Sequence, residues 1–270
     1  LRLHPMQRMT QRLEQDRAAR RGSLMPFVTA GSPSIEATVA TIKALDRLGV
    51  AAIEVGFPFS DPIADGPVIA ASMDRALRSG TTVAGTMNAI KAIRPQVGCG
   101  LIAMVSMSIV HRHGGAAFVR EAHEAGFDAL IMPDMDVDAA DQVLEAVDAL
   151  GMGLALLVAP TSIPERIRSI TARCRGFVYA LARAGLTGTS DAPPDVAGTV
   201  AALRAQTQLP IAVGFGISTA EHVRLVIRDA DAAIVGSALV RAMDGDPATA
   251  HERASAFIRP LIEACHAASA

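Results

Sequence analysis

Eight short apolar runs, each followed by a stretch with helical periodicity, alternate along almost the whole of this 270-residue chain. The runs are rich in branched aliphatic residues, which is typical of strands buried on both faces of a parallel sheet. A doubly wound sheet can reach this length, but eight strand–helix units in about 250 residues favour a (β/α)8 TIM barrel. The eight runs are LMPFVTA (24–30), AAIEVGF (51–57), GLIAMVSM (100–107), FDALIMP (127–133), MGLALLVAP (152–160), GFVYAL (176–181), LPIAVGF (209–215) and DAAIVGS (231–237).

Residues 6–20 form a further helical pattern before the first run, and no linker or low-complexity tract divides the chain. We therefore expect residues 1–270 to form a single domain. Half of the residues are hydrophobic, and the net charge of −2 offers no basic surface to nucleic acid. The three cysteines are widely spaced, which suits a reducing cytoplasm, and no apolar run is long enough to span a membrane. These features predict a soluble cytoplasmic protein.

In a barrel of this kind the chemistry lies at the carboxyl ends of the strands and in the loops that follow them. Long loops rich in glycine and proline follow the second and the sixth predicted strands. Loops of this length are often mobile covers of an active site, so these two are the candidate substrate covers.

Glycine-bearing turns follow the last three predicted strands, and they indicate a phosphate site. Glycine lets backbone N–H groups approach an anion, and a helix that begins at Gly236-Ser237 would add further donors. In barrels this corner is a frequent phosphate site. The alternative is that the glycines only make tight turns. The residues are Gly185 and Gly188, Gly214 and Gly216, and Gly236 with Ser237.

Three carboxylates lie in the stretch IEVGFPFSDPIADGP (53–67). Glu54 should point into the barrel, because its neighbours Ile53 and Val55 should face the helices. A buried carboxyl either pairs with a cation or takes a raised pKa, and a raised pKa suits proton transfer. The residue is therefore a candidate acid/base, with a structural ion pair as the alternative. Asp61 and Asp65 can serve as turn formers or as site residues.

Two other chemistries find little support in the sequence. His111 and His113 form an H-x-H pair, but no third ligand is placed to complete a metal set, so surface-loop histidines are the simpler reading. The only lysines, Lys43 and Lys91, fall in predicted helices rather than at strand ends. This disfavours a Schiff-base aldolase. We expect neither a metal nor a cofactor.

With these residues in place, the chain resembles the α subunit of tryptophan synthase over nearly its whole length. The resemblance implies a retro-aldol cleavage of indole-3-glycerol phosphate to indole and glyceraldehyde 3-phosphate. It makes Glu54 the catalytic acid/base and Asp65 the carboxylate that meets the indole N–H. The matching segments are MPFVTAGSP (25–33), IEVGFPFSDPIADGP (53–67), RGFVYALARAGLTG (175–188), VGFGIS (213–218) and IVGSALV (234–240).

The resemblance also implies a set of substrate-binding residues. Two aromatic residues contact the indole or line its site, a threonine lies in the closing loop, and three glycines and a serine bind the phosphate. These are Phe27 and Tyr179, Thr187, and Gly188, Gly216, Gly236 and Ser237.

The chain departs from the family pattern after the third and fourth strands. There the family has Tyr-x-Asn-Pro and Asp-Leu-Pro, whereas this chain has Ser106, Ser108, Ile109 and Asp136. In the family these loops help contact a β subunit, which uses pyridoxal phosphate. Three hypotheses follow: an α subunit with a divergent interface, a freestanding indole-3-glycerol-phosphate lyase, and a non-catalytic activator of a β-type subunit. Intact Glu54 and Asp65 count against the last.

Overall fold

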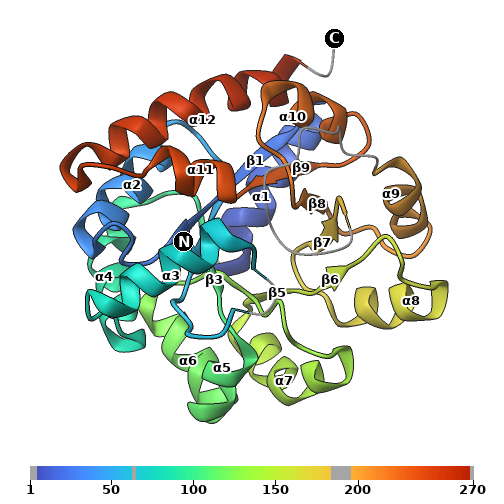
Figure 1. The fold of residues 1–270 in the computed structure, drawn as a ribbon. Helices are drawn as coiled ribbons and strands as arrows, with labels where there is room; N and C mark the ends of the chain where they lie inside the picture. Colours follow the sequence, from blue (N-terminus) through green and yellow to red (C-terminus); the bar gives the residue numbers. More distant parts are fainter. Residues whose placement is uncertain (1–4, 63–64, 184–195, 268–270) are drawn as a thin grey trace.

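The computed structural model describes residues 5–62, 65–183 and 196–267, and it confirms the (β/α)8 barrel. Parallel strands form one sheet in the order β5-β4-β3-β2-β1-β9-β8-β7-β6, and helices surround it (Figure 1). The strands are β1 (Ser23–Thr29), β2 (Ala52–Gly56), β3 (Gly100–Met104), β4 (Ala129–Ile131), β5 (Gly153–Ala155), β6 (Leu157–Val158), β7 (Val178–Leu181), β8 (Ile211–Gly214) and β9 (Ala232–Val235).

The fifth predicted strand is divided in two, which explains why nine strands make an eight-unit barrel. β5 pairs with β4, and β6 pairs with β7. The two pieces are separated only by Leu156, whose carbonyl oxygen accepts a hydrogen bond from the Tyr179 N–H at 3.2 Å. The barrel therefore closes through residues 153–158, and the interruption lies at the seam.

The helices follow the strands as the periodicity predicts, and Ser34 caps α2 by accepting a hydrogen bond from the Ala37 N–H. No helix in the described part of the chain is both long and apolar enough to cross a bilayer. They are α1 (Pro5–Ala18), α2 (Ile35–Arg47), α3 (Pro67–Arg78), α4 (Val83–Ile93), α5 (Met107–Arg112), α6 (Ala116–Ala125), α7 (Asp141–Leu150), α8 (Pro164–Arg173), α9 (Ala197–Arg204), α10 (Ala220–Ile227), α11 (Ser237–Ala242) and α12 (Ala250–Ala267).

Helix α5 was not anticipated, and it corrects the assignment of His111 and His113 to a surface loop. His111 lies in the last turn of α5, and His113 is its C-cap residue. Ser106 caps the amino end of the helix by accepting a hydrogen bond from the Ser108 N–H at 3.2 Å. The apolar period of a six-residue helix is too short to stand out from the strand that precedes it.

Successive side chains along each strand point alternately into the core outside the barrel and into the core inside it, and this alternation turns Glu54 inward. Ile53 and Val55 belong to the large core between the strands and the surrounding helices. Glu54 lies between them on β2, in register with Phe27 of β1 and Ile102 of β3, both of which belong to the core inside the barrel. The inward orientation predicted for Glu54 is therefore confirmed.

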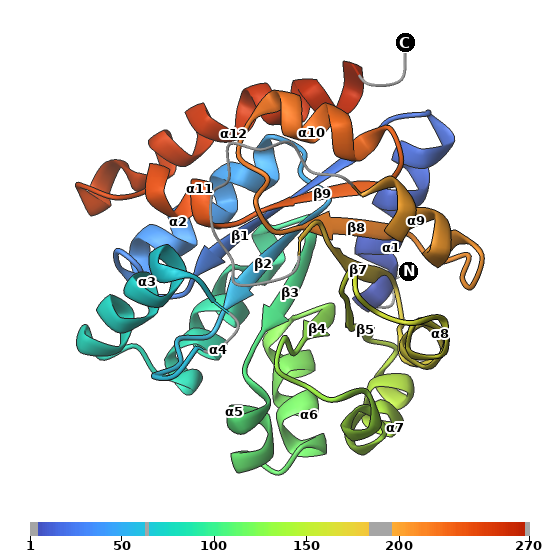
Figure 2. The ribbon, with the colours of Figure 1, turned by 45° about the vertical axis from the view of Figure 1, so that its right-hand side comes forward.

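Helix α1 closes the amino end of the barrel, and the opposite end is left for the site. Met9 of α1 is fully buried among residues inside the barrel. A Cβ on Gly100 at the start of β3 would lie 2.8 Å from the Met9 Cβ, so only glycine allows this close approach. Figure 2 shows α1 at the tails of the strands, with α3 and α11 on the side of the arrowheads.

Candidate active site

A cavity of about 540 Å³ opens at the carboxyl ends of the strands, where a barrel enzyme holds its substrate. It brings together residues from β1, β2, β7 and β9 and from the loops that follow β2, β4 and β8. Seven of the nine residues predicted for the site line it: Phe27, Glu54, Asp65, Tyr179, Gly216, Gly236 and Ser237. The other two, Thr187 and Gly188, lie outside the described residues.

Glu54 forms part of the cavity wall without an ionic or hydrogen-bonded partner among the described residues. Its side chain is only 1% exposed, and neither carboxylate oxygen makes a hydrogen bond there. Burial raises the pKa of Glu54 well above its ordinary value, and the negative charge of Asp65 raises it further. A carboxyl with a raised pKa keeps its proton to a higher pH than an ordinary glutamate and can donate it to a bound molecule.

Asp65 reaches the same cavity from the loop between β2 and α3. Its N–H donates to the Pro62 carbonyl at 3.0 Å, and Gly66 follows as the N-cap residue of α3. Asp65 therefore lies directly before α3, and its position is tied to the first turn of that helix. Asp61, in contrast, is exposed and lines a second cavity beside the first.

Aromatic rings form much of the apolar surface of the cavity. Tyr179 and Phe215 meet edge to face, with ring centroids 6.2 Å apart. Burial raises the pKa of Tyr179 well above its ordinary value, with Glu54 and Asp65 contributing, so its hydroxyl stays protonated. A Cβ on Gly214 would lie 2.1 Å from the Tyr179 hydroxyl oxygen, so glycine makes room for the phenol.

The glycine-rich corner lines the same cavity as the acids, and here the sequence prediction of a helix start is confirmed. Helix α11 begins at Ser237, immediately after Gly236, and Ser237 and Ala238 line the cavity. The first N–H groups of a helix have no acceptor within the helix. Gly216 contributes a backbone with φ of +84° that favours glycine. Backbone donors thus converge on one side of the cavity.

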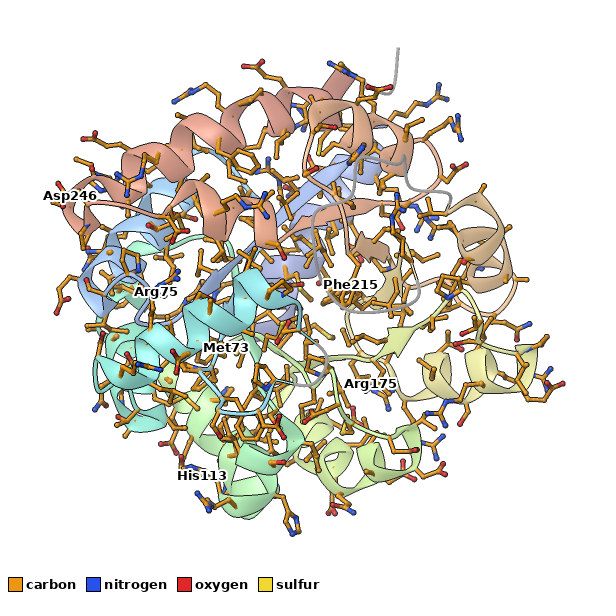
Figure 3. All side chains as sticks on the ribbon, in the orientation of Figure 1. Met73, Arg75, His113, Arg175, Phe215 and Asp246 are labelled. Atoms are coloured by element: carbon orange, nitrogen blue, oxygen red, sulfur yellow. The ribbon has the colours of Figure 1, made fainter. Side chains whose placement is uncertain are left out.

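Sequence reasoning missed several apolar residues of the site. Phe215 has a φ of +77°, which is rare for a residue with a side chain, and such backbone strain is often found at functional sites. Its place directly after β8 was the available signal (Figure 3). The other missed residues that line the cavity are Ile69, Met104, Pro133, Leu157, Ile217, Ile234 and Ala238.

The loops after β3 and β4, where the sequence departs from the family pattern, are joined to one another. Asp134 accepts hydrogen bonds from the Ser106 hydroxyl at 2.6 Å and from the Met107 N–H at 2.8 Å. Asp136 is exposed and lies 3.6 Å from Arg166 of α8. Ser108 is exposed and Ile109 is partly buried against the core. Ser106 and Asp134 form a polar edge of the second cavity.

The described residues contain no cluster of three or more His, Cys, Asp or Glu side chains that could hold a metal ion. The three cysteines are buried, and burial raises the pKa of Cys174 to about 11 and that of Cys265 to about 12. Thiols in this state are poor nucleophiles. The side chains that can move a proton in the cavity are therefore carboxyl groups and a phenol.

The barrel and its acid-lined cavity define the class of protein: a TIM barrel with a candidate active site at the carboxyl ends of its strands. Comparison with known proteins identifies the family within that class. The family described as "Tryptophan synthase alpha chain" matches residues 13–266. This chain belongs to the tryptophan synthase alpha chain family.

The relatives cover almost the whole chain. The tryptophan synthase alpha chain of Thermosynechococcus vestitus is 41% identical over 237 residues, which are 87% of this chain and 89% of the relative. That of Xylella fastidiosa is 37% identical and covers 97% of this chain and 99% of its own. A structure of tryptophan synthase from Mycobacterium tuberculosis superposes with a TM-score of 0.87 at 36% identity, covering 96% of this chain and 98% of that one.

Proposed function

We propose that this protein is a carbon–carbon lyase that cleaves indole-3-glycerol phosphate to indole and glyceraldehyde 3-phosphate, the reaction of its family. The observation that carries the proposal is the buried Glu54 carboxyl, which lines an apolar cavity without a partner among the described residues. A carboxyl kept for structure would be paired, because an unpaired buried carboxyl costs several kcal/mol of desolvation or must take up a proton. Its place in one cavity with the backbone donors of Gly216, Gly236 and Ser237 fits a substrate with an apolar ring and a phosphate.

In this reaction Glu54 moves a proton twice. The protonated carboxyl first donates its proton to the indole ring carbon that carries the glycerol chain, which leaves a positively charged indolenine. The resulting carboxylate then takes the proton of the adjacent glycerol hydroxyl. The carbon–carbon bond breaks, its electron pair returns to the ring, and the products are indole and an aldehyde. Glu54 is protonated again, so the cycle is balanced and its raised pKa matches the starting state.

Asp65 acts on the ring nitrogen. As a carboxylate it accepts a hydrogen bond from the indole N–H and stabilises the positive charge that develops when the ring carbon is protonated. Its negative charge also raises the pKa of Glu54, so the two acids work in different protonation states.

Substrate binding divides between the two sides of the cavity. Phe27 and Tyr179 offer apolar contact to the indole, while Gly216, Gly236 and Ser237 supply donors to the phosphate. Thr187 and Gly188 complete this set in the family and are proposed to do so here. With the phosphate and the ring both held, the bond to be broken lies beside Glu54.

We further propose that the chain works as an α subunit with a tryptophan synthase β subunit. The match to tryptophan synthase alpha chains over most of the chain supports this partner. A freestanding lyase is the second candidate, and it is favoured by the residues that depart from the family's interface loops, Ser106, Ser108, Ile109 and Asp136.

Steady-state cleavage of indole-3-glycerol phosphate, with and without a β subunit, tests both proposals. An α subunit should be slow alone and at least about tenfold faster with β, because closure of the site is then completed by the partner. Turnover on the order of 1 per second or more without β would instead make it a freestanding lyase. No cleavage in either case, with faster β turnover, would leave only an activator and would contradict the lyase proposal.

A further inference from the structure

A second cavity lies against the proposed indole site. The two cavities share three lining residues: Asp65, Met104 and Pro133. We call the second one the side cavity; its other walls include Phe57, Phe59 and Met73. The side cavity lacks the glycine-rich corner, since Gly216, Gly236 and Ser237 line only the first.

We propose that the side cavity receives a substituent on the benzo ring of the substrate, so that this lyase cleaves indole-3-glycerol phosphates that carry a small apolar ring substituent. The inference rests on the proposed function, which fixes how the substrate lies. The phosphate binds at Gly236 and Ser237, and the indole N–H meets Asp65. Since Asp65 also borders the side cavity, a ring held by its nitrogen has an edge beside the shared wall of Met104 and Pro133.

The chemistry of the side cavity selects the kind of substituent. Its aromatic rings and methionines, Phe57, Phe59, Met73 and Met104, offer apolar contact. Its carboxylates, Asp61 and Asp134, disfavour an anion, and the Asp134 oxygens already accept hydrogen bonds from Ser106 and Met107. A methyl or chloro group therefore fits, whereas a carboxylate is repelled by like charge.

Met104 lines both cavities and so separates them. Its side chain is 9% exposed, and methionine has three rotatable bonds and adapts to irregular space. Met73 of α3 lines the side cavity but not the indole site. The flexible side chains can make room for a methyl group that a rigid wall would exclude.

The test compares kcat/KM for unsubstituted indole-3-glycerol phosphate with that for its 4-, 5-, 6- and 7-methyl derivatives. We expect at least one methyl isomer to be cleaved within about threefold of the parent, whereas a closed hydrophobic wall discriminates by about 10–200-fold per methyl group. The carboxyl derivative at the accepted position should be cleaved at least about 100-fold less well. A parent that is cleaved while all four methyl isomers fall more than about 100-fold below it would overturn the inference alone. A parent that is not cleaved overturns the proposed function as well.

A pair of matched variants locates the effect. Met73→Phe places a rigid ring in the side cavity and should lower the ratio of methyl to parent kcat/KM at least about tenfold. Met152→Phe makes the same change at a buried position that lines neither cavity, and it should leave the ratio unchanged. An equal fall for both substrates in Met73→Phe would contradict the inference. Phe59→Ala, at a half-buried position, should enlarge the side cavity. For a substrate with an ethyl group at the ring position where methyl is accepted, this variant should raise kcat/KM relative to that of the parent substrate. The absence of a rise would contradict the inference.

Discussion

The two ends of the barrel each bury a carboxylate, and they treat it in opposite ways. At the amino end, Asp128 is fully buried and accepts hydrogen bonds from Arg8 at 2.6 Å, from Arg94 at 3.3 Å and from the Leu101 N–H at 2.8 Å. At the carboxyl end, Glu54 is equally buried, and its oxygens have no hydrogen-bond partner among the described residues.

The difference separates a structural acid from a reactive one. Burial raises the pKa of Asp128 above its ordinary value, and Arg94, the Leu101 N–H and Arg8 offset part of this rise by stabilising the charged form. For Glu54, burial and the charge of Asp65 act in the same direction, and the pKa rises well above the ordinary range. Among the described residues no cation meets the Glu54 carboxyl, which favours its protonated form and leaves a proton available for transfer to a substrate.

The largest expected effect is on catalysis. Glu54→Gln keeps the shape of the side chain and removes its proton transfer, so cleavage of indole-3-glycerol phosphate should fall by about 10²–10⁴-fold. The measurement is kcat for the purified variant, with far-ultraviolet circular dichroism to check the fold. Activity within a factor of about three of the wild type would remove Glu54 from the mechanism.

The matched change at the other end should act on stability. Asp128→Asn leaves Arg94 buried beside a neutral side chain and should lower the free energy of unfolding by roughly 3 kcal/mol. This is the lower end of the usual cost, because Arg8 is partly exposed and the Asn oxygen can still accept from the Leu101 N–H. Urea unfolding gives the value. The kcat of the folded variant should stay within about twofold of the wild type, and a large loss would mean that the two ends are coupled.

The pH dependence of stability tests the raised pKa of Glu54 directly. Below its ordinary value of 4.5, Glu54 is protonated in both the folded and the unfolded chain, and the wild type and Glu54→Gln should respond alike. As the pH rises above that value, the unfolded chain ionises first, so the wild type loses stability relative to the variant by up to about 1.4 kcal/mol per pH unit.

The loss should end once the pH passes the pKa of Glu54 in the folded protein. The difference between the two urea-unfolding free energies, measured from pH 4 to pH 8, follows this course if the prediction holds. A wild type that gains stability relative to Glu54→Gln as the pH rises would show that Glu54 is stabilised as a carboxylate, as Asp128 is by its partners.

The smallest effect is expected at Tyr179. Its ring supports the cavity wall, and Glu54 makes no hydrogen bond to it. Tyr179→Phe should therefore lower kcat/KM by less than about tenfold. It should also leave unchanged the way in which the free energy of unfolding varies with pH. Gly214→Ala is the contrasting change, since its methyl group would collide with the phenol, and it should reduce activity more. A changed pH course in Tyr179→Phe would reveal a hydrogen bond between the phenol and Glu54.

Most of the fold could be read from the sequence because strand and helix periods are local properties. The eight strand–helix units, the inward side of Glu54 and the start of α11 at Ser237 all follow from alternation and from glycine placement. Helix α5 and the break at Leu156 did not, because both depend on how the barrel closes and how its loops pack.

The site shows the same division. The acids and the glycines stand out in the sequence, because a carboxylate in an apolar strand and clustered glycines at strand ends are unusual there. Met104, Pro133 and Leu157 do not, since an apolar residue at the end of an apolar strand looks like any core residue. The side cavity could not be predicted from the sequence either, because its walls come from several segments that are distant in the sequence.

The sequence by itself determined the strand–helix alternation, the family and the pair of acids Glu54 and Asp65. Only the tertiary structure decided which buried acid is paired and which is not. Arg8 and Arg94 reach Asp128 across 120 and 34 residues of chain, whereas no described residue reaches the Glu54 carboxyl. Whether a carboxylate is neutralised depends on charges brought close in space, and its own neighbours in the sequence do not reveal them.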